Sequence, residues 1–348
     1  MLIALGIVVA QTVASVPLRI TVHNDLAFAR TSETVEVALT GDLSRIHVFE
    51  HGSGKEVLAQ ALSDRLIFQT DIPANGERTF DLRSGEPHKY KKEDFRVYGR
   101  FVRERFDDFA WENDRVAHRM YGAALETWEK EPLTSSAVDV WLKRTRRLVI
   151  NDWYMVDDYH RDHGEGADFY SAGKSRGCGG TGIWREGKLV VSKNFRDTRV
   201  IANGPIRLIF ELVYPGFETK RITLDAGQNF GRFEDRFDID APQFAVGIKK
   251  NTGAIVRSAR SDGWMRTWEP VTGGTGQFGC AIVLDPGSID GIVEADGNYV
   301  MVARPPAIYY VGTGWDKSGD FGGVADWDRY VEQWSQRVKS PLRMEVAP

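Results

Sequence analysis

The densest group of side chains able to do chemistry is the stretch DDYHRDHGEGADFY, residues 157–170. Two of the seven histidines, His160 and His163, lie there three residues apart among five acidic residues. Because an imidazole changes charge near neutral pH, the pair could act as general base and general acid. The pair could also bind a divalent metal, with Glu165 or Asp157 completing a His-His-carboxylate set. A solvated loop without a catalytic role is the third interpretation.

A glycine-rich segment, SAGKSRGCGGTGIW, follows directly and surrounds Arg176 with five glycines. Glycine permits positive φ and close backbone approach, which is typical of a loop that folds over a cleft. An arginine beside such a loop can pair with a carboxylate or sulfate through two parallel hydrogen bonds. We therefore predict acid–base catalysis on an acidic substrate. The predicted catalytic residues are His160, His163 and Tyr159, and the predicted substrate contacts from this region are Arg176 and Glu165.

The stretch RFDDFAWENDRVAHRMYG mixes ionisable and aromatic side chains in a pattern that predicts an extended strand. Alternate residues of an uninterrupted strand share one face, so Trp111, Asn113 and Arg119 would lie together with a second arginine and a tyrosine. Aromatic faces stack on sugar rings, and arginines pair with acidic groups. We predict these three residues as substrate-binding residues of a sugar subsite. The alternative is an exposed strand with cross-strand ion pairs.

Short runs in which apolar and polar residues alternate cover most of the chain and predict β-strands. Between Leu18 and Leu82 turn signals separate these runs, which predicts an antiparallel, sandwich-like lobe at residues 16–90. Similar runs continue well beyond this lobe without intervening amphipathic helices, and one of them is VDVWLKRTRRLVI at 138–150. Within that run, KRTRRL is expected to form a solvated strand face.

The segment GGVADWDRYVEQWSQRV near the end differs, because its apolar residues keep helical spacing. We expect one helix there, packed on the sheet. The sequence therefore predicts an all-β fold, a large antiparallel β-sandwich with a few helices including one at the C-terminus. The expected single domain spans residues 16–348.

Composition restricts the class of partner and the compartment. The net charge of −4 and pI near 6.0 argue against a nucleic-acid-binding protein. The segment MLIALGIVVAQTVAS, residues 1–15, has the pattern of a secretory signal peptide, and no apolar run approaches the roughly 20 residues needed to cross a bilayer. We therefore predict a secreted or periplasmic protein without a membrane span. Cys178 and Cys280 could form one disulfide or remain two buried thiols.

Several longer stretches make the chain resemble a known family. They are FARTSETVEV, LIFQTDIPANGERTF, DDFAWENDRVAHRMYG, DVWLKRTRRLVINDWY, YHRDHGEGADFYSAGKSRGCGGTGIW, NFRDTRVIANGPIRLIFEL and ETKRITLDAG. Over nearly the whole mature chain the sequence resembles a bacterial secreted family known as domain of unknown function 4861. The resemblance implies a supersandwich of the galactose-mutarotase kind and a role in breaking down acidic polysaccharides. Some members are described as dehydratases that act on the terminal uronic acid of ulvan-type oligosaccharides, and the resemblance transfers no catalytic residue.

Removing water from a uronic acid requires a base for the weakly acidic C5 proton, an acid for the departing hydroxyl and a group that neutralises the carboxylate. The expected function is therefore a carbon–oxygen lyase, a uronate oligosaccharide dehydratase, whose partner is an acidic oligosaccharide. No cofactor is expected, with a divalent metal left open.

Three other functions use related side chains. A polysaccharide lyase would expel a sugar by the same chemistry. A glycoside hydrolase would need a carboxylate pair, for which Glu112 and Glu165 are candidates. A non-catalytic carbohydrate-binding protein would use the aromatic and arginine side chains without turnover.

Overall fold

The computed structural model describes residues 11–12, 17–130 and 132–347, which belong to two compact units. The first unit comprises residues 1–95, 204–206 and 340–348, and the second comprises residues 96–203 and 207–339. The predicted signal peptide at residues 1–15 lies outside the described residues, apart from Gln11–Thr12.

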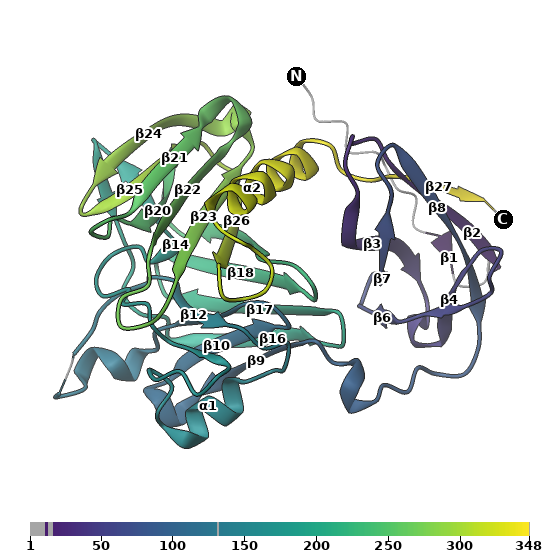
Figure 1. Cartoon of the computed structure of the whole chain (residues 1–348), viewed down its shortest axis with the longest axis horizontal. Coiled ribbons are helices and arrows are strands. Elements are labelled where there is room, and N and C mark those ends of the chain that lie inside the picture. The colour runs from purple at the N-terminus through teal and green to yellow at the C-terminus, as the bar shows by residue number, and fades with distance from the viewer. Residues whose placement is uncertain (1–10, 13–16, 131, 348) are drawn as a thin grey trace. The chain divides into compact units, whose positions relative to one another are not determined.

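The first unit is built from two sheets (Figure 1). They share one core made mainly of Leu, Ile, Val and Phe side chains. One sheet has the order β1 (Gln11–Thr12), β3 (Arg30–Thr40), β7 (Arg65–Ile72) and β6 (Ala59–Ala61). The other has the order β27 (Arg343–Ala347), β2 (Leu18–Asn24), β8 (Gly76–Ser84), β4 (Ile46–Glu50) and β5 (Glu56–Val57). Buried residues alternate along β2, as expected for a strand with one face on the core.

The second unit contains three sheets. The largest has the order β16 (Asp197–Asn203), β17 (Arg207–Tyr214), β18 (Glu218–Asp225), β19 (Phe230–Phe237), β26 (Ala307–Trp315), β23 (Gln277–Leu284), β22 (Trp264–Pro270) and β21 (Ile255–Ala259). The second has the order β15 (Lys188–Val190), β14 (Cys178–Arg185), β20 (Phe244–Lys249), β25 (Asn298–Ala303) and β24 (Ile289–Ala295). The third has the order β13 (Gly166–Ala167), β12 (Asp139–Lys143), β11 (Ala117–Met120), β10 (Asp108–Asn113) and β9 (Val97–Val102). One hydrophobic core receives side chains from all three sheets.

The C-terminal helix α2 (Val324–Lys339) packs on β22 and β23 of the largest sheet, so the predicted helix is confirmed (Figure 1). Its Trp327 and Val331 are buried in a cluster with aromatic residues of the sheet. Gly279 on β23 and Gly314 on β26 leave the space that the Trp327 ring occupies, because a Cβ at either position would collide with it. No helix in the described part of the chain is long and apolar enough to cross a membrane.

The strand expected at 138–150 ends early, and after a loop the short helix α1 (Ile150–Val156) begins at the last expected strand residue. Strand β12 ends at Lys143, whose Nζ lies 2.6 Å from the buried carboxylate of Glu112. The same carboxylate accepts hydrogen bonds of 2.7–2.9 Å from the backbone N–H groups of Val149 and Ile150. The prediction of a single strand is wrong because this carboxylate satisfies the first amides of a helix.

The segment predicted as one strand over residues 105–122 is a hairpin of β10 and β11. The side chain of Asn113 accepts two backbone N–H hydrogen bonds of 2.8 Å within the turn, which reverses the chain. Trp111 consequently pairs with His118, and Ala110 pairs with Arg119. Arg119 therefore lies on the face opposite to Trp111. The predicted shared face is wrong because the turn shifts the alternation by one residue.

The two cysteines lie in the core as free thiols. The Cys178 thiol is 3.6 Å from the carbonyl oxygen of Gly312. Burial, with the neighbouring Cys178 thiol adding to it, raises the pKa of Cys280 well above its usual range. Of the two alternatives left by the sequence, the structure has two buried thiols.

Candidate active site

Neighbouring strands bring three carboxylates to one buried arginine. Arg119 on β11 donates from Nε to Asp139 Oδ2 on β12 (2.7 Å) and from Nη2 to Asp168 Oδ2, directly after β13 (2.9 Å). Asp108, the first residue of β10, lies 3.8 Å from Nη1. Arg119 and Asp139 are directly paired across the ladder, so their side chains project from the same face. We call these four buried residues the Arg119 cluster.

The Arg119 cluster places three carboxylates against one guanidinium. Burial raises the pKa of Asp168 well above its usual range, and the adjacent Asp139 adds to this rise. Burial also raises the pKa of Asp108 to about 7, against the opposing charge of Arg119. Oδ1 of Asp168 is buried and has no hydrogen-bond partner among the described residues. The cluster therefore retains a proton near neutral pH.

His160 lies next to the Arg119 cluster, and its imidazole is 61% exposed. Its Nδ1 is 3.0 Å from the carbonyl oxygen of Asp168 and 3.5 Å from Oδ2 of the same residue. Because a carbonyl only accepts, Nδ1 carries the hydrogen and Nε2 presents its lone pair. Nε2 makes no hydrogen bond with any described residue. An oriented imidazole with a free basic nitrogen is the geometry of a general base.

Tyr159 connects His160 to the Arg119 cluster. Its hydroxyl accepts a 3.4 Å hydrogen bond from Arg119 Nη1, and its ring centroid is 4.5 Å from that of His160. The ring also stacks on Trp141 at 5.3 Å. Burial raises the pKa of Tyr159, so its hydroxyl keeps its proton at neutral pH.

Arg105, which the sequence analysis did not single out, also contacts the Tyr159 ring. Its guanidinium carbon is 5.2 Å from the centroid of that ring and 6.0 Å from the centroid of Trp128. Trp128 packs on Phe106 with a centroid distance of 4.3 Å, and all three side chains are half-buried. Among the described residues Arg105 has no hydrogen-bond or ion-pair partner, so its N–H groups are available to an anion. An arginine in a half-buried turn gives no sequence signal that separates it from a surface arginine.

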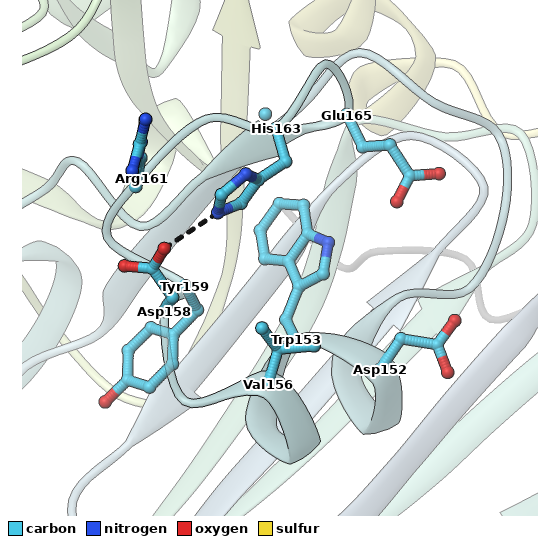
Figure 2. A pocket seen from close by; sticks show the side chains of 9 residues that line it. Asp152, Trp153, Val156, Asp158, Tyr159, Arg161, His163 and Glu165 are labelled. Carbon is cyan, nitrogen blue, oxygen red and sulfur yellow. Dashed lines mark hydrogen bonds and ion pairs between the residues drawn. The ribbon is translucent and has the colours of Figure 1, made fainter.

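A pocket of about 210 Å³ adjoins Tyr159 (Figure 2). It is lined by Asp152, Trp153, Val156, Asp158, Tyr159, Arg161, His163, Glu165 and Gly166. Figure 2 shows the imidazole of His163 directed at the carboxylate of Asp158, and Nε2 lies 2.9 Å from Oδ2. Both side chains are about half exposed, so this pair orients His163 weakly compared with the buried support of His160.

Two of the five acids in residues 157–170 form ion pairs with the basic run KRTRRL. Arg144 forms an ion pair with Asp162. Arg147 donates from Nε and Nη2 to the two carboxylate oxygens of Glu165 at 2.8 and 3.0 Å. This pairing lowers the pKa of Glu165. The expectation of a solvated strand face for KRTRRL is therefore wrong. The residues after Lys143 form a loop, and its arginines form ion pairs with the loop that carries His160 and His163.

Three predicted substrate-binding residues are buried away from this site. Trp111 belongs to the hydrophobic core. Asn113 donates to the carbonyl oxygens of Asp225 (2.6 Å) and Gln228 (2.7 Å), so its amide is fully used. Arg176 is buried and donates from Nη1 to Ser136 Oγ (3.0 Å), and burial lowers its pKa to about 10. The structure therefore gathers His160, Tyr159 and Arg119 of the predicted set, with His163 and Glu165 in the adjoining pocket.

The metal and hydrolase alternatives find little support in this loop. Among the described residues, neither Glu165 nor Asp157 joins His160 and His163 in a converging set of metal ligands. Glu112, one of the two carboxylates considered for a hydrolase, is fully buried with Lys143. It cannot reach a glycosidic bond without unfolding of β10.

Comparison with known sequences decides the family. The model of the family described as "Domain of unknown function (DUF4861)" matches residues 22–344. The chain belongs to this family. It is also 32% identical, over a 372-residue alignment, to "Uncharacterized protein P7" of Formosa agariphila. That alignment covers 94% of this chain and 93% of the relative.

Solved structures show where the fold recurs. A protein of glycosyl hydrolase family 38 from Enterococcus faecalis superposes with a TM-score of 0.52 at 10% identity, covering 95% of this chain and 47% of that chain. An alpha-mannosidase from Enterococcus faecalis V583 gives 0.52 at 9% identity, covering 95% and 46%. This chain thus spans about half the length of these proteins, and the similarity concerns the fold. The predicted all-β sandwich class is confirmed.

Proposed function

We propose that this protein is an exported carbohydrate-active carbon–oxygen lyase that removes water by β-elimination from the terminal uronic acid of an acidic oligosaccharide. The observation that carries the proposal is that an oriented imidazole and an arginine with no hydrogen-bond or ion-pair partner among the described residues both contact the Tyr159 ring. Abstraction of a proton beside a carboxylate requires a base and a cation that binds the carboxylate, and the imidazole and the arginine are of these two kinds.

The roles follow from the geometry. Arg105 pairs with the uronate carboxylate, which lowers the negative charge that opposes loss of the C5 proton. His160 Nε2 takes this proton, and the carbonyl oxygen of Asp168, which accepts from Nδ1, stabilises the imidazolium that results. Trp128 and Phe106 offer an apolar surface for the sugar ring.

The departing hydroxyl needs a proton at C4. Tyr159 keeps its hydroxyl proton at neutral pH and is the first candidate for the acid. His163 in the adjoining pocket is the second, because an imidazole can donate a proton and its Nε2 lies 2.9 Å from Asp158 Oδ2. The Arg119 cluster fixes Tyr159 and His160 together and is assigned a positioning role.

The alternatives differ in their products. A polysaccharide lyase would shorten the oligosaccharide, a hydrolase would add water, and a binding protein would leave it unchanged. The test is incubation of the full protein with uronate-terminated oligosaccharides, with absorbance of a conjugated uronate and product mass as readouts. Dehydration predicts new absorbance together with loss of the mass of one water at constant chain length. Shortened or unchanged oligosaccharides would overturn the proposal.

A further inference from the structure

A second group of chemically active side chains lies in the first unit and is unrelated to the proposed function. His47 on β4, Glu56 on β5 and His88, which follows β8, each offer one ligand atom, and these three atoms lie within 4.8 Å of one another. The pairing of Phe49 with Glu56 places the carboxylate diagonally beside His47 on the same face of the sheet. Strand pairing and the chain after β8 therefore bring three metal-ligating side chains together from three segments.

The backbone fixes which ring nitrogen of each histidine is free. His47 Nε2 lies 2.8 Å from the carbonyl oxygen of Glu86, and His88 Nε2 lies 2.8 Å from the carbonyl oxygen of Ile46. Since a carbonyl only accepts, both Nε2 atoms carry hydrogen and both Nδ1 atoms are left as ligand atoms. Donation of the second ring N–H to a backbone carbonyl is the usual support of a metal-bound histidine. Nδ1 of His47 lies 2.5 Å from Glu56 Oε1, in a hydrogen bond whose proton a bound metal ion would replace.

The imidazoles are held in place before any ligand binds. The His47 and His88 rings have a centroid distance of 4.4 Å, and His88 stacks on Tyr90 at 5.6 Å. The Tyr90 hydroxyl is anchored by a 2.9 Å hydrogen bond to the carbonyl oxygen of Ala59. Gly85 has no Cβ, and a Cβ there would come within 2.8 Å of the His47 ring. Glu56 is 53% exposed, so an ion can enter from solvent.

We propose that His47, His88 and Glu56 form a binding site for a divalent cation of the zinc class, with a water molecule in the remaining position. Two imidazole nitrogens and one carboxylate are ligands that zinc accepts in tetrahedral sites. The bound ion would link the β4–β5 hairpin to the segment after β8, so occupancy should stabilise the first unit.

The test uses the full chain, stripped with a chelator and titrated with zinc chloride by calorimetry, with thermal unfolding as a second readout. The wild type should bind one zinc ion per chain and unfold at a higher temperature with zinc. His88→Ala and Glu56→Gln should weaken binding by about tenfold or more. Glu56→Gln changes an exposed side chain and should leave the fold intact, so weaker binding by this variant cannot be due to unfolding. His51→Ala, at an exposed histidine of the same unit, should bind as the wild type does.

Three results would overturn the proposal. The first is no zinc binding by the wild type. The second is unchanged binding by both His88→Ala and Glu56→Gln. The third is loss of binding in His163→Ala with retention in His88→Ala, which would place the ion at the candidate active site.

Discussion

Replacing Arg105 by alanine should impair catalysis while leaving the fold intact. The guanidinium has no hydrogen-bond or ion-pair partner among the described residues, so the loss is confined to its contacts with aromatic rings and its longer-range attraction to Asp108 and Asp168. The free energy of unfolding should therefore change by about 1 kcal/mol or less. A charge-assisted hydrogen-bonded pair with a substrate carboxylate contributes about 1.5–3 kcal/mol. At about 1.4 kcal/mol per tenfold, kcat/KM should fall about 12- to 140-fold.

The assay is initial-rate kinetics on a uronate-terminated oligosaccharide, followed by absorbance of the unsaturated product. Arg103→Ala is the matched control, because Arg103 belongs to the same turn but is exposed. Arg105→Lys should recover part of the loss, since lysine restores the charge without the planar pair of donors. Equal kcat/KM for wild type and Arg105→Ala, or an equal loss in Arg103→Ala, would refute the assignment of Arg105 as the carboxylate anchor.

Two stability predictions test the buried charges. The raised pKa of Asp108 means that the folded protein holds a proton which the unfolded chain releases above about pH 4, so stability falls as pH rises towards 7. Asp108→Asn imitates the protonated acid and should be more stable than wild type at pH 8 by about 2–4 kcal/mol. Below pH 4 the two proteins should have the same free energy of unfolding, and urea unfolding across pH measures both differences. An unchanged difference at pH 4 and pH 8 would contradict this. Glu112→Ala should cost about 3–5 kcal/mol, because Lys143 would be left buried without a counter-charge. Glu165→Ala, which breaks the exposed pair with Arg147, should lower the free energy of unfolding by only about 0–1 kcal/mol. Equal losses of stability in Glu112→Ala and Glu165→Ala would contradict the argument from burial.

The fold class could be predicted because strand periodicity is local. A two-residue alternation identifies strands one at a time, and helical spacing in the last segment identifies α2. The hairpin at Asn113 could not be foreseen, since one side chain that accepts two turn amides shifts every later residue to the opposite face. This single shift separates Trp111 from Arg119 and removes the predicted sugar subsite.

Part of the candidate site was also accessible from sequence. Residue types alone lead to the prediction of His160, Tyr159 and His163, because an imidazole changes charge near neutral pH and a phenol can donate a proton. Which of these residues has a buried, well-oriented partner depends on contacts between segments that are distant in the sequence. Asp168 becomes the support of His160 only when β13 pairs with β12 and places it beside Arg119. The pairing of Glu165 with Arg147 likewise joins segments that the sequence shows separately.

The central claim is that His160 abstracts the proton in a dehydration. The most direct measurement compares wild type, His160→Ala and His163→Ala on one uronate-terminated oligosaccharide, with absorbance and product mass recorded together. Wild type should release one water without shortening the chain, and His160→Ala should be slower by about 100- to 10,000-fold with an unchanged melting temperature, since the imidazole is largely exposed. His163→Ala should lose less than His160→Ala. Full activity of His160→Ala, or a wild-type product that has lost no water, would contradict the account.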